Sequence, residues 1–231
     1  MRSSAMRSDV SIQVISLSSD CKKRDSVSAV LDSYNLNYSF YDAVNGKELS
    51  AIEYFYHCNN NDYFFNRKSI LTPGEVGCKL SHLKILEDFV NNQSDYNWLC
   101  VLEDDISLKC DLNIVFNNLS EIFSKSIIHL GGQEGLNSKN RVVKSFKGSF
   151  DKLNYYKVLP ITLRWLYRTC GYIVSKEIAL EMLSIFKKNN IPADNWRYIV
   201  KKSSVRDFIF CDVVTHPVDL SGSSIEAERG V

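Results

Sequence analysis

The sequence has no excess charge of either sign and no paired cysteines. Its 28 basic and 27 acidic side chains leave a formal net charge of +1. Such a balance provides no global field to steer nucleic acid, so nucleic acid is not an expected partner. The seven cysteines are scattered singly without a CxxC pair, which argues against a zinc ribbon or a thioredoxin-like site. Single thiols within apolar runs are typical of a reducing compartment.

Long apolar runs are also missing. No segment approaches the ~20 apolar residues that span a bilayer, and the opening MRSSAMRSDV does not resemble a signal peptide. We therefore expect a cytoplasmic protein. Residues 1–9 are expected to be a flexible N-terminus or an expression remnant, and residues 10–231 to form one domain.

What is present is the pattern of a globular α/β protein. Hydrophobic residues make up 45% of the 231 residues, enough to bury a sizeable core. Residues 10–17 predict a first strand, Asp20 is placed to cap the next helix, and residues 38–44 predict a second strand. Strand, helix and strand at this spacing are typical of a parallel α/β sheet. Residues 50–70 are polar and aromatic without clear periodicity, which favours a loop.

The best-defined helix is predicted to follow Thr72. This residue can cap the helix, Pro73 suits its first turn, and Glu75 can complete a capping box. An apolar stripe then follows at helical spacing, formed by Val76, Leu80, Leu83, Leu86 and Val90.

Residues 98–102 are apolar on both faces, as expected of a strand in the middle of a sheet. Further elements are expected as strands at 127–130, 170–174 and 208–214 and as a helix at 178–186. Together these segments predict an α/β fold with a mostly parallel central sheet flanked by helices.

Three consecutive carboxylates, Glu103, Asp104 and Asp105, follow the apolar strand. In open α/β sheets, ligands bind beyond the carboxyl ends of strands. Strand alternation places Glu103 and Asp105 on one side, where a divalent cation would offset their repulsion. Oxygen ligands suit Mg²⁺ or Mn²⁺, which commonly share such sites with substrate phosphates. The alternative is a solvated loop whose aspartates cap a helix.

Four segments together resemble glycosyltransferase family 25, whose bacterial members build lipooligosaccharide and related glycans. They are VISL at 14–17 with DCKKR at 20–24, DAVNG at 42–46, LTPGEVGCKLSHL at 71–83 and LEDDI at 102–106. Weaker similarity follows at 171–175, 192–194 and 223–225. The third and fourth segments are the most specific, and they occur in order about twenty residues apart.

The resemblance implies a GT-A-like (Rossmann-like) fold, a nucleotide-sugar donor, and Mn²⁺ or Mg²⁺ bound by a DxD-like motif, whose place residues 103–105 take. It also implies an inverting reaction, a single displacement at the anomeric carbon, with UDP-galactose as the first donor to test. The implied acceptor is a lipooligosaccharide or another oligosaccharide or glycolipid. Peripheral contact with the inner membrane surface is left open.

In the implied metal site, Asp105 is the first candidate ligand and Glu103 the second. Asp104 is assigned to the donor, through a hydrogen bond to the ribose, or else to a structural partner. His216 follows the last predicted strand and stands beside Pro217. It either completes the metal site or is structural.

Asp194 is the candidate general base, because inverting transfer needs a group that removes the proton of the acceptor hydroxyl. It matches the P-x-D of the family, and it equally suits a helix N-cap. Glu75 is a weaker candidate for the base, with the capping box as its alternative.

Further donor contacts are assigned to Leu17, Arg24, Gly74, Gly77, Ser81 and His82. Arg24 either meets the nucleotide phosphate or lies on a solvated face. The two glycines allow close backbone approach to the ligand or serve packing alone. The polar pair Ser81 and His82 either contacts the ligand or stabilises helix–sheet packing.

The polar segment 219–231 is expected to be mobile without ligand and to order over the bound donor, with Ser223 and Ser224 near the diphosphate. The acceptor pocket is expected to draw on residues 50–70 and 155–168.

Two other functions remain as alternatives. One is a nucleotide-sugar or carbohydrate-binding protein of the same fold without turnover, against which the intact acidic cluster argues. The other is a metal-dependent hydrolase or nucleotidyltransferase, but those enzymes often use two metals and more ligands than the sequence offers.

Overall fold

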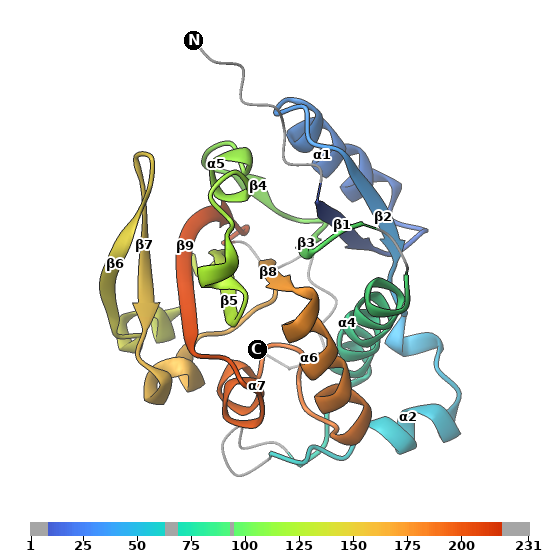
Figure 1. Cartoon of the computed structure of the whole chain (residues 1–231). Helices are drawn as coiled ribbons and strands as arrows, with labels where there is room; N and C mark the ends of the chain where they lie inside the picture. The colour runs from blue at the N-terminus through green and yellow to red at the C-terminus, as the bar shows by residue number, and fades with distance from the viewer. Residues whose placement is uncertain (1–8, 63–68, 93–94, 219–231) are drawn as a thin grey trace.

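The computed structural model describes residues 9–62, 69–92 and 95–218. Its centre is a nine-stranded sheet with the order β2-β1-β3-β8-β5-β9-β7-β6, and the short strand β4 pairs with β9 (Figure 1). The strands are β1 (Val10–Ser16), β2 (Tyr38–Asp42), β3 (Trp98–Glu103), β4 (Ser107–Leu108), β5 (Ser126–Gly131), β6 (Lys144–Phe150), β7 (Leu153–Val158), β8 (Gly171–Ser175) and β9 (Asp207–Thr215).

Most strands of the sheet run in one direction. β1 is parallel to both β2 and β3, and β5 is parallel to β9. β8 is antiparallel to β3 and to β5, so these two parallel groups share one direction. The β6–β7 hairpin is antiparallel and joins the sheet through β9. The carboxyl ends of β1, β2, β3, β5 and β9 therefore meet at one edge of the sheet.

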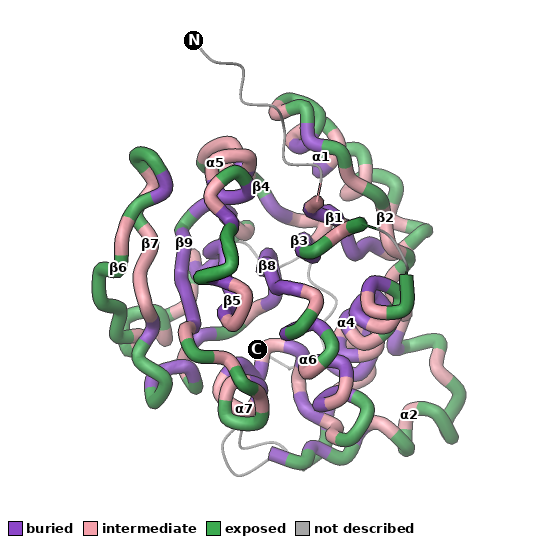
Figure 2. The backbone as a smooth tube through the Cα atoms, viewed as in Figure 1, coloured by how far each residue is buried: buried purple, intermediate pink, exposed green. Residues whose placement is uncertain are grey.

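Helices cover both faces of the sheet. α1 (Cys21–Asp32) and α5 (Asn113–Phe116) pack on one face, and α4 (Pro73–Asn91), α6 (Lys176–Lys188) and α7 (Trp196–Lys202) pack on the other. Figure 2 shows the strands between these layers mostly buried. Short 3₁₀ turns are η1 (Gly46–Glu48), η2 (Glu121–Phe123), η3 (Asn137–Arg141) and η4 (Pro160–Trp165). This arrangement confirms the predicted α/β fold with a mostly parallel sheet flanked by helices.

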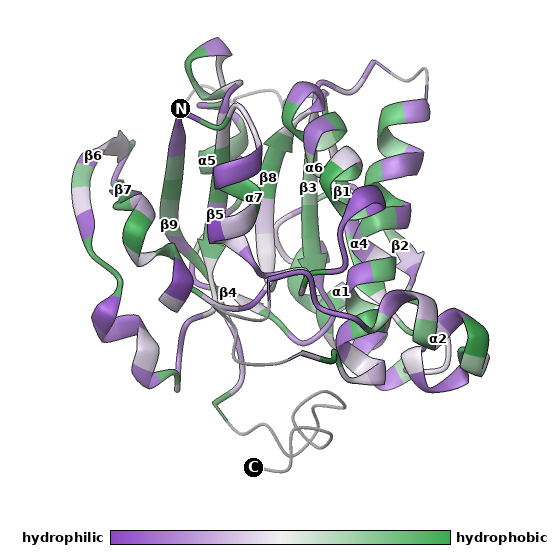
Figure 3. Ribbon diagram, turned by 90° about the horizontal axis from the view of Figure 1, so that it is seen from below, coloured by the Kyte–Doolittle hydropathy of each residue, from purple (hydrophilic) through white to green (hydrophobic). Residues whose placement is uncertain are grey.

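β3 shows why its sequence is apolar on both faces. Cys100 and Leu102 belong to the core beneath α1 and α5, whereas Leu99 and Val101 belong to the core beneath α4 and α6. The five residues before Glu103 are all buried, and the strand is coloured hydrophobic along its length in Figure 3. The prediction of a central strand is confirmed.

Local capping fixes where the helices before the site begin. The side chain of Asp20 accepts a hydrogen bond from the Lys23 backbone N–H at the start of α1. Thr72 and Glu75 form the predicted capping box of α4, with Pro73 in its first turn. Both helices start beside the edge at which the parallel strands end.

The sequence analysis did not identify two of the observed elements, a helix and a hairpin. Part of the segment 50–70 is not a loop but α2 (Ala51–His57), whose capping box is made by Ser50 and Glu53. No residue of α2 is buried. Ile52, Phe55 and Tyr56 do stand at helical spacing, but they form only one short, exposed stripe. The β6–β7 hairpin was also not predicted. Its outer strand β6 is largely exposed, so its alternating pattern is weak.

Among the described residues, no helix combines the length and apolar character needed to cross a membrane.

Candidate active site

A pocket of about 390 Å³ opens at the edge where the parallel strands end. Its walls come from the ends of β1 and β3, from the turn after β2, from the first turns of α4 and from the segment before β8. All three carboxylates at 103–105 line it, together with Asp194 and His216. The edge that the topology predicts for a ligand therefore holds a cavity of ligand size.

The three carboxylates have different partners. Oε1 of Glu103 accepts a hydrogen bond of 2.5 Å from the hydroxyl of Thr169. Oδ1 of Asp104 lies 3.9 Å from Nζ of Lys23, and Oδ2 of Asp105 lies 3.3 Å from Nε2 of His216. Glu103 and Asp105 thus face the β8–β9 side of the pocket, while Asp104 faces α1.

Burial and mutual repulsion separate the protonation behaviour of these groups. Burial raises the pKa of Glu103 to about 7, and the Asp105 carboxylate adds to the rise. Burial also raises the pKa of Asp104, against a hydrogen bond from Ser16 and the charge of Lys23. For Asp105, burial is outweighed by the hydrogen bond and charge of His216, so its pKa is lowered. The pocket therefore concentrates negative charge. Lys23 and His216 are the basic side chains that contact these carboxylates, and they offset only part of that charge.

His216 is oriented as a metal-binding histidine would be. Its Nδ1 lies 2.8 Å from the carbonyl oxygen of Pro217, which fixes that nitrogen as the donor and leaves Nε2 directed at Asp105. Burial lowers the pKa of His216, but the hydrogen bond and charge of Asp105 outweigh it, so the pKa is raised. The contact between the two side chains is an ion pair whenever the imidazole is protonated.

The donor set at this point fits a divalent cation. One oxygen of Glu103, a ring nitrogen of His216 and the sulfur of Cys170 lie within 4.8 Å of one another. Asp105 joins them through His216, and its Oδ1 is buried without a hydrogen-bond partner within the described part of the chain. A buried carboxylate oxygen without a partner is costly unless another group satisfies it. The two carboxylates suit Mn²⁺ or Mg²⁺, whereas the imidazole and the Cys170 sulfur are softer ligands.

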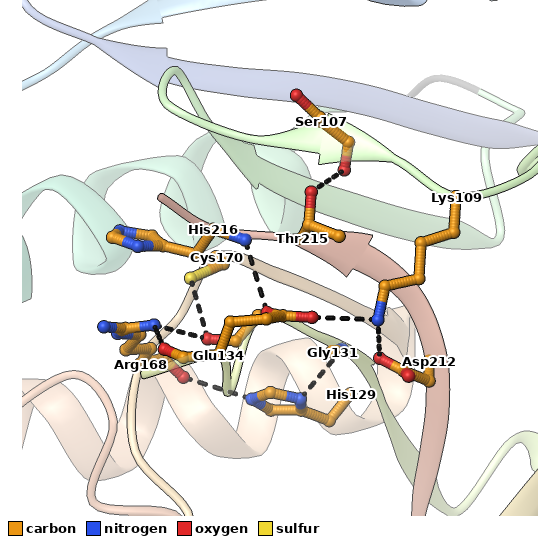
Figure 4. A network of polar contacts seen from close by, with 11 residues as sticks. Ser107, Lys109, His129, Gly131, Glu134, Arg168, Cys170, Asp212, Thr215 and His216 are labelled. Atoms are coloured by element: carbon orange, nitrogen blue, oxygen red, sulfur yellow. Dashed lines mark hydrogen bonds and ion pairs between the residues drawn. The ribbon is translucent and has the colours of Figure 1, made fainter. Parts of the chain in front are cut away.

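A polar network lies behind His216, on the side away from its ring (Figure 4). The His216 backbone N–H donates to Oε2 of Glu134 at 3.4 Å. Nζ of Lys109 lies 2.8 Å from Oε1 of Glu134 and 2.8 Å from Oδ1 of Asp212. Because this chain of charges links β9 to the segment after β5, it holds the backbone of His216 in place.

Asp194 lines the same pocket as the acidic triplet. Its Oδ2 accepts a hydrogen bond of 2.9 Å from the backbone N–H of Arg168. The helix that follows is capped by Asn195, whose side chain accepts from the N–H of Tyr198. The N-cap alternative for Asp194 is therefore wrong, because one residue further along the chain has the capping geometry. The carboxylate instead faces the cavity.

Ser81 and His82 are both buried at the pocket wall. The hydroxyl of Ser81 accepts from the Val44 N–H at 2.9 Å and donates to the Gly77 carbonyl at 2.8 Å. Nδ1 of His82 lies 2.9 Å from the hydroxyl of Tyr172. Both therefore stabilise packing, as one alternative held, and both also line the cavity. Burial lowers the pKa of His82 to about 3, so its imidazole is neutral.

The two glycines of α4 differ in their surroundings. Gly74 lines the pocket, whereas Gly77 packs against the chain after β2. A Cβ at Gly77 would lie 2.6 Å from the Gly46 nitrogen and 2.6 Å from the Val44 oxygen. Gly77 thus serves packing, and it lets α4 approach the turn that forms one pocket wall. Glu75 lines the pocket but is engaged in the capping box.

Arg24 and Leu17 have separate positions at the end of β1. Leu17 lines the pocket. The guanidinium of Arg24 pairs with Asp42, donates to the Ser16 carbonyl at 3.0 Å and lies 4.8 Å from the centre of the Phe40 ring. It joins the ends of β1 and β2 and is not among the pocket residues. The cation of this segment that lines the pocket is Lys23.

Sequence reasoning missed Lys23 and Thr169 as pocket residues, and it included Arg168 only as the last residue of the segment 155–168. Arg168 has a positive φ of 70°, a backbone conformation that is uncommon outside glycine and often marks a functional turn. Nothing in its residue type signals that conformation. Arg168 also ends the segment 155–168 that was expected to contribute to the acceptor pocket. The described residues of the segment 50–70 do not line this cavity, and Ser223 and Ser224 lie outside the described residues.

Comparison with known proteins gives one family. A family model described as glycosyltransferase family 25 (LPS biosynthesis protein) matches residues 10–196. A search of curated proteins finds no match. Among solved structures, the chain is similar to the crystal structure of a glycosyltransferase involved in glycosylation of the major capsid of PBCV-1. The identity is 13% and the TM-score 0.45, over 96% of this chain and 99% of that one.

Proposed function

Because the chain belongs to glycosyltransferase family 25, we propose that it is a metal-dependent, inverting enzyme of GT-A-like fold that transfers a sugar from a nucleotide-sugar donor to a surface glycan. UDP-galactose is the first donor to test, and a lipooligosaccharide is the first acceptor. The observation that carries the proposal is the convergence of Glu103, Asp105 and His216 at one pocket, with a buried Asp105 oxygen that has no hydrogen-bond partner among the described residues.

Glu103, Asp105 and His216 would hold Mn²⁺ or Mg²⁺ in this pocket. When bound, such a cation would supply charge neutralisation for the diphosphate of the departing nucleotide. Thr169 fixes the Glu103 carboxylate through its 2.5 Å hydrogen bond. The network through Glu134 and Lys109 holds the backbone of His216. The ligand side chains are therefore positioned before any donor arrives.

Lys23 and Asp104 lie on the α1 side of the same pocket. The ammonium group of Lys23, 3.9 Å from Asp104, is placed to pair with a phosphate oxygen of the donor. Asp104 would then accept a hydrogen bond from a ribose hydroxyl, as a carboxylate at the end of a strand does in nucleotide-binding sheets. This division leaves the donor diphosphate between Lys23 and the Glu103–Asp105 pair.

Asp194 is the group proposed to take the proton of the acceptor. The acceptor oxygen forms a bond to the anomeric carbon while the bond from that carbon to the phosphate oxygen breaks. The hydroxyl proton passes to Asp194, and the electron pair of the broken bond leaves with the nucleoside diphosphate. The backbone N–H of Arg168 donates a hydrogen bond of 2.9 Å to the Asp194 carboxylate. This bond fixes the position of the carboxylate at the pocket wall.

The acceptor would approach past Arg168, which borders the pocket beside Asp194. Exposed apolar side chains on α2, including Ile52, Phe55 and Tyr56, are placed to support peripheral contact with an inner membrane that carries a glycolipid acceptor.

The test is UDP release from a panel of UDP-sugars with Mn²⁺, with and without truncated lipooligosaccharide acceptors. Release that depends on the acceptor and is lost in Asp105→Ala supports the proposal. Asp25→Ala is the matched control, because Asp25 is exposed on α1 outside the pocket. Donor binding without release in the presence of a competent acceptor would instead support a binding protein without turnover.

A further inference from the structure

A second group of potential ligands shares Glu103 with the set that contains His216. Cys78 and His82 are four residues apart on α4, so their side chains project from one face of the helix. The Cys78 sulfur, a ring nitrogen of His82 and an oxygen of Glu103 lie within 4.8 Å of one another. All three residues line the same pocket.

His82 provides an independent sign that a ligand is missing. The side chain is fully buried, and its Nδ1 lies 2.9 Å from the Tyr172 hydroxyl. Its Nε2 has no hydrogen-bond partner among the described residues. The contact at Nδ1 resembles the outer contacts that orient metal-bound histidines. A buried nitrogen left in this state is satisfied when it binds a cation or a ligand atom.

This set combines a thiol, an imidazole and one carboxylate, which select a softer cation such as Zn²⁺ over Mg²⁺ or Mn²⁺. The set around His216 contains the same three ligand types, with Cys170 as its thiol, but has the Asp105 carboxylate beside it as a further hard ligand. Tetrahedral bond lengths of about 2.0–2.3 Å place neighbouring ligand atoms roughly 3.3–3.8 Å apart. The 4.8 Å limit on the observed separations therefore requires closure of about 1.5 Å at most. The Cys78 sulfur has a weak contact of 3.9 Å with the Thr169 hydroxyl that would be replaced.

We propose that Cys78, His82 and Glu103 form a binding site for Zn²⁺ or a similar soft divalent cation, with one coordination position open to the pocket. Glu103 is shared with the set that contains Asp105 and His216. Occupancy of the soft site would withdraw this carboxylate from that set, so Zn²⁺ would inhibit transfer. The inhibitory consequence rests on the proposed function, whereas the binding site itself does not.

The test uses Co²⁺ as a coloured substitute for Zn²⁺, added to the reduced protein. Thiolate ligation gives a charge-transfer absorption band, which Zn²⁺ should then abolish by displacement. The band should be lost in Cys78→Ser. It should require at least tenfold more Co²⁺ in His82→Gln, because even outer-shell changes cost roughly 10- to 100-fold in metal affinity. Cys110→Ser is the control, since Cys110 is also partly buried but lies outside the pocket.

Cys170→Ser separates the two candidate sets, because Cys170 lies beside Glu103 and His216. A band lost in Cys170→Ser but kept in Cys78→Ser would overturn the proposal, as would absence of a band in the unaltered protein.

A check that needs no variant is alkylation of the unaltered protein followed by mass spectrometry. Zn²⁺ should slow the modification of Cys78 at least about tenfold relative to Cys110, and equal rates would overturn the site.

In assays of UDP release with Mn²⁺, the Zn²⁺ concentration for half inhibition should rise roughly tenfold or more in Cys78→Ser, each variant being compared with its own rate without Zn²⁺. An unchanged value would contradict the inhibitory role. If no donor or acceptor supports UDP release, the proposed function fails, and the Co²⁺ spectra still decide whether the site exists.

Discussion

Nε2 of His216 lies 3.3 Å from Oδ2 of Asp105, although the two residues are far apart in the sequence. β4 follows Asp105 and pairs with the end of β9, from which His216 continues. The pairing of these two strands is what brings the imidazole to the carboxylate. The contact explains how a histidine near the end of the chain becomes part of a site that begins at residue 103.

Substitution of His216 distinguishes a ligand from a structural side chain. We expect His216→Gln to weaken Mn²⁺ binding by roughly tenfold or more, because it removes an imidazole ligand. The thermal midpoint should change little, since the glutamine amide can still donate to the Asp105 carboxylate in place of Nε2, and Nδ1 contacts the adjacent Pro217 carbonyl. Isothermal titration with Mn²⁺ measures the affinity, and thermal unfolding measures the midpoint. Unchanged Mn²⁺ affinity would assign His216 a structural role.

Removal of the Asp194 charge tests the proposed base. Asp194→Asn keeps an oxygen that can accept the Arg168 N–H, so the fold and donor binding should be preserved. The transfer rate should fall by roughly 10²- to 10⁴-fold, the usual contribution of a general base. The measurement is kcat alongside UDP affinity. A kcat within a few-fold of the unaltered enzyme would exclude Asp194 as the base.

The contact between Gly77 and Gly46 predicts a loss of stability on substitution. A Cβ at Gly77 would meet backbone atoms 2.6 Å away, which cannot move without shifting the turn after β2. We expect Gly77→Ala to lower the free energy of unfolding by roughly 1–3 kcal/mol, measured by urea denaturation. Ser28→Ala on α1 is a suitable control, and equal midpoints for the two variants would contradict the close approach.

Acid should destabilise the fold through His129. Burial lowers its pKa to about 4, below the ordinary value of about 6.5. The unfolded chain therefore binds more protons between these values, so stability present above pH ~6.5 is lost as the pH falls towards 4. This residue alone should contribute up to about 1.4 kcal/mol per pH unit. The measurement is the free energy of unfolding in urea at pH 7 and at pH 5. The loss of stability between these two pH values should be smaller in His129→Gln than in the unaltered protein, and an equal loss in both would refute the assignment to His129.

Much of the fold follows from local sequence signals. The apolar run before Glu103 identifies a strand buried on both faces, and Thr72 with Glu75 identifies the start of α4. In contrast, α2 is a helix of seven residues that buries none of them, and one short apolar set at helical spacing is too little to distinguish such a helix from a loop. Signals of burial reveal elements of the core, and they fail for elements that lie on the surface.

The site was predictable where its residues sit at strand ends, and less so elsewhere. The acidic triplet follows a buried strand, so its place at the sheet edge could be inferred. The exclusion of Arg24 from the pocket depends on its pairing with Asp42 across two strands, which residue type alone does not indicate. Lys23 lines the pocket from the first turn of α1, and Arg168 lines it from a backbone position with a positive φ. Neither feature has a distinctive sequence pattern.

The most direct test of the account is Mn²⁺ binding in the presence of UDP, followed by the paramagnetic resonance signal of free Mn²⁺. The unaltered protein should bind one Mn²⁺ per chain. Asp105→Asn should weaken that binding by roughly tenfold or more, whereas Asp25→Asn, exposed on α1, should leave it unchanged. Equal Mn²⁺ affinity in the unaltered protein and in Asp105→Asn would contradict a metal site at the acidic triplet.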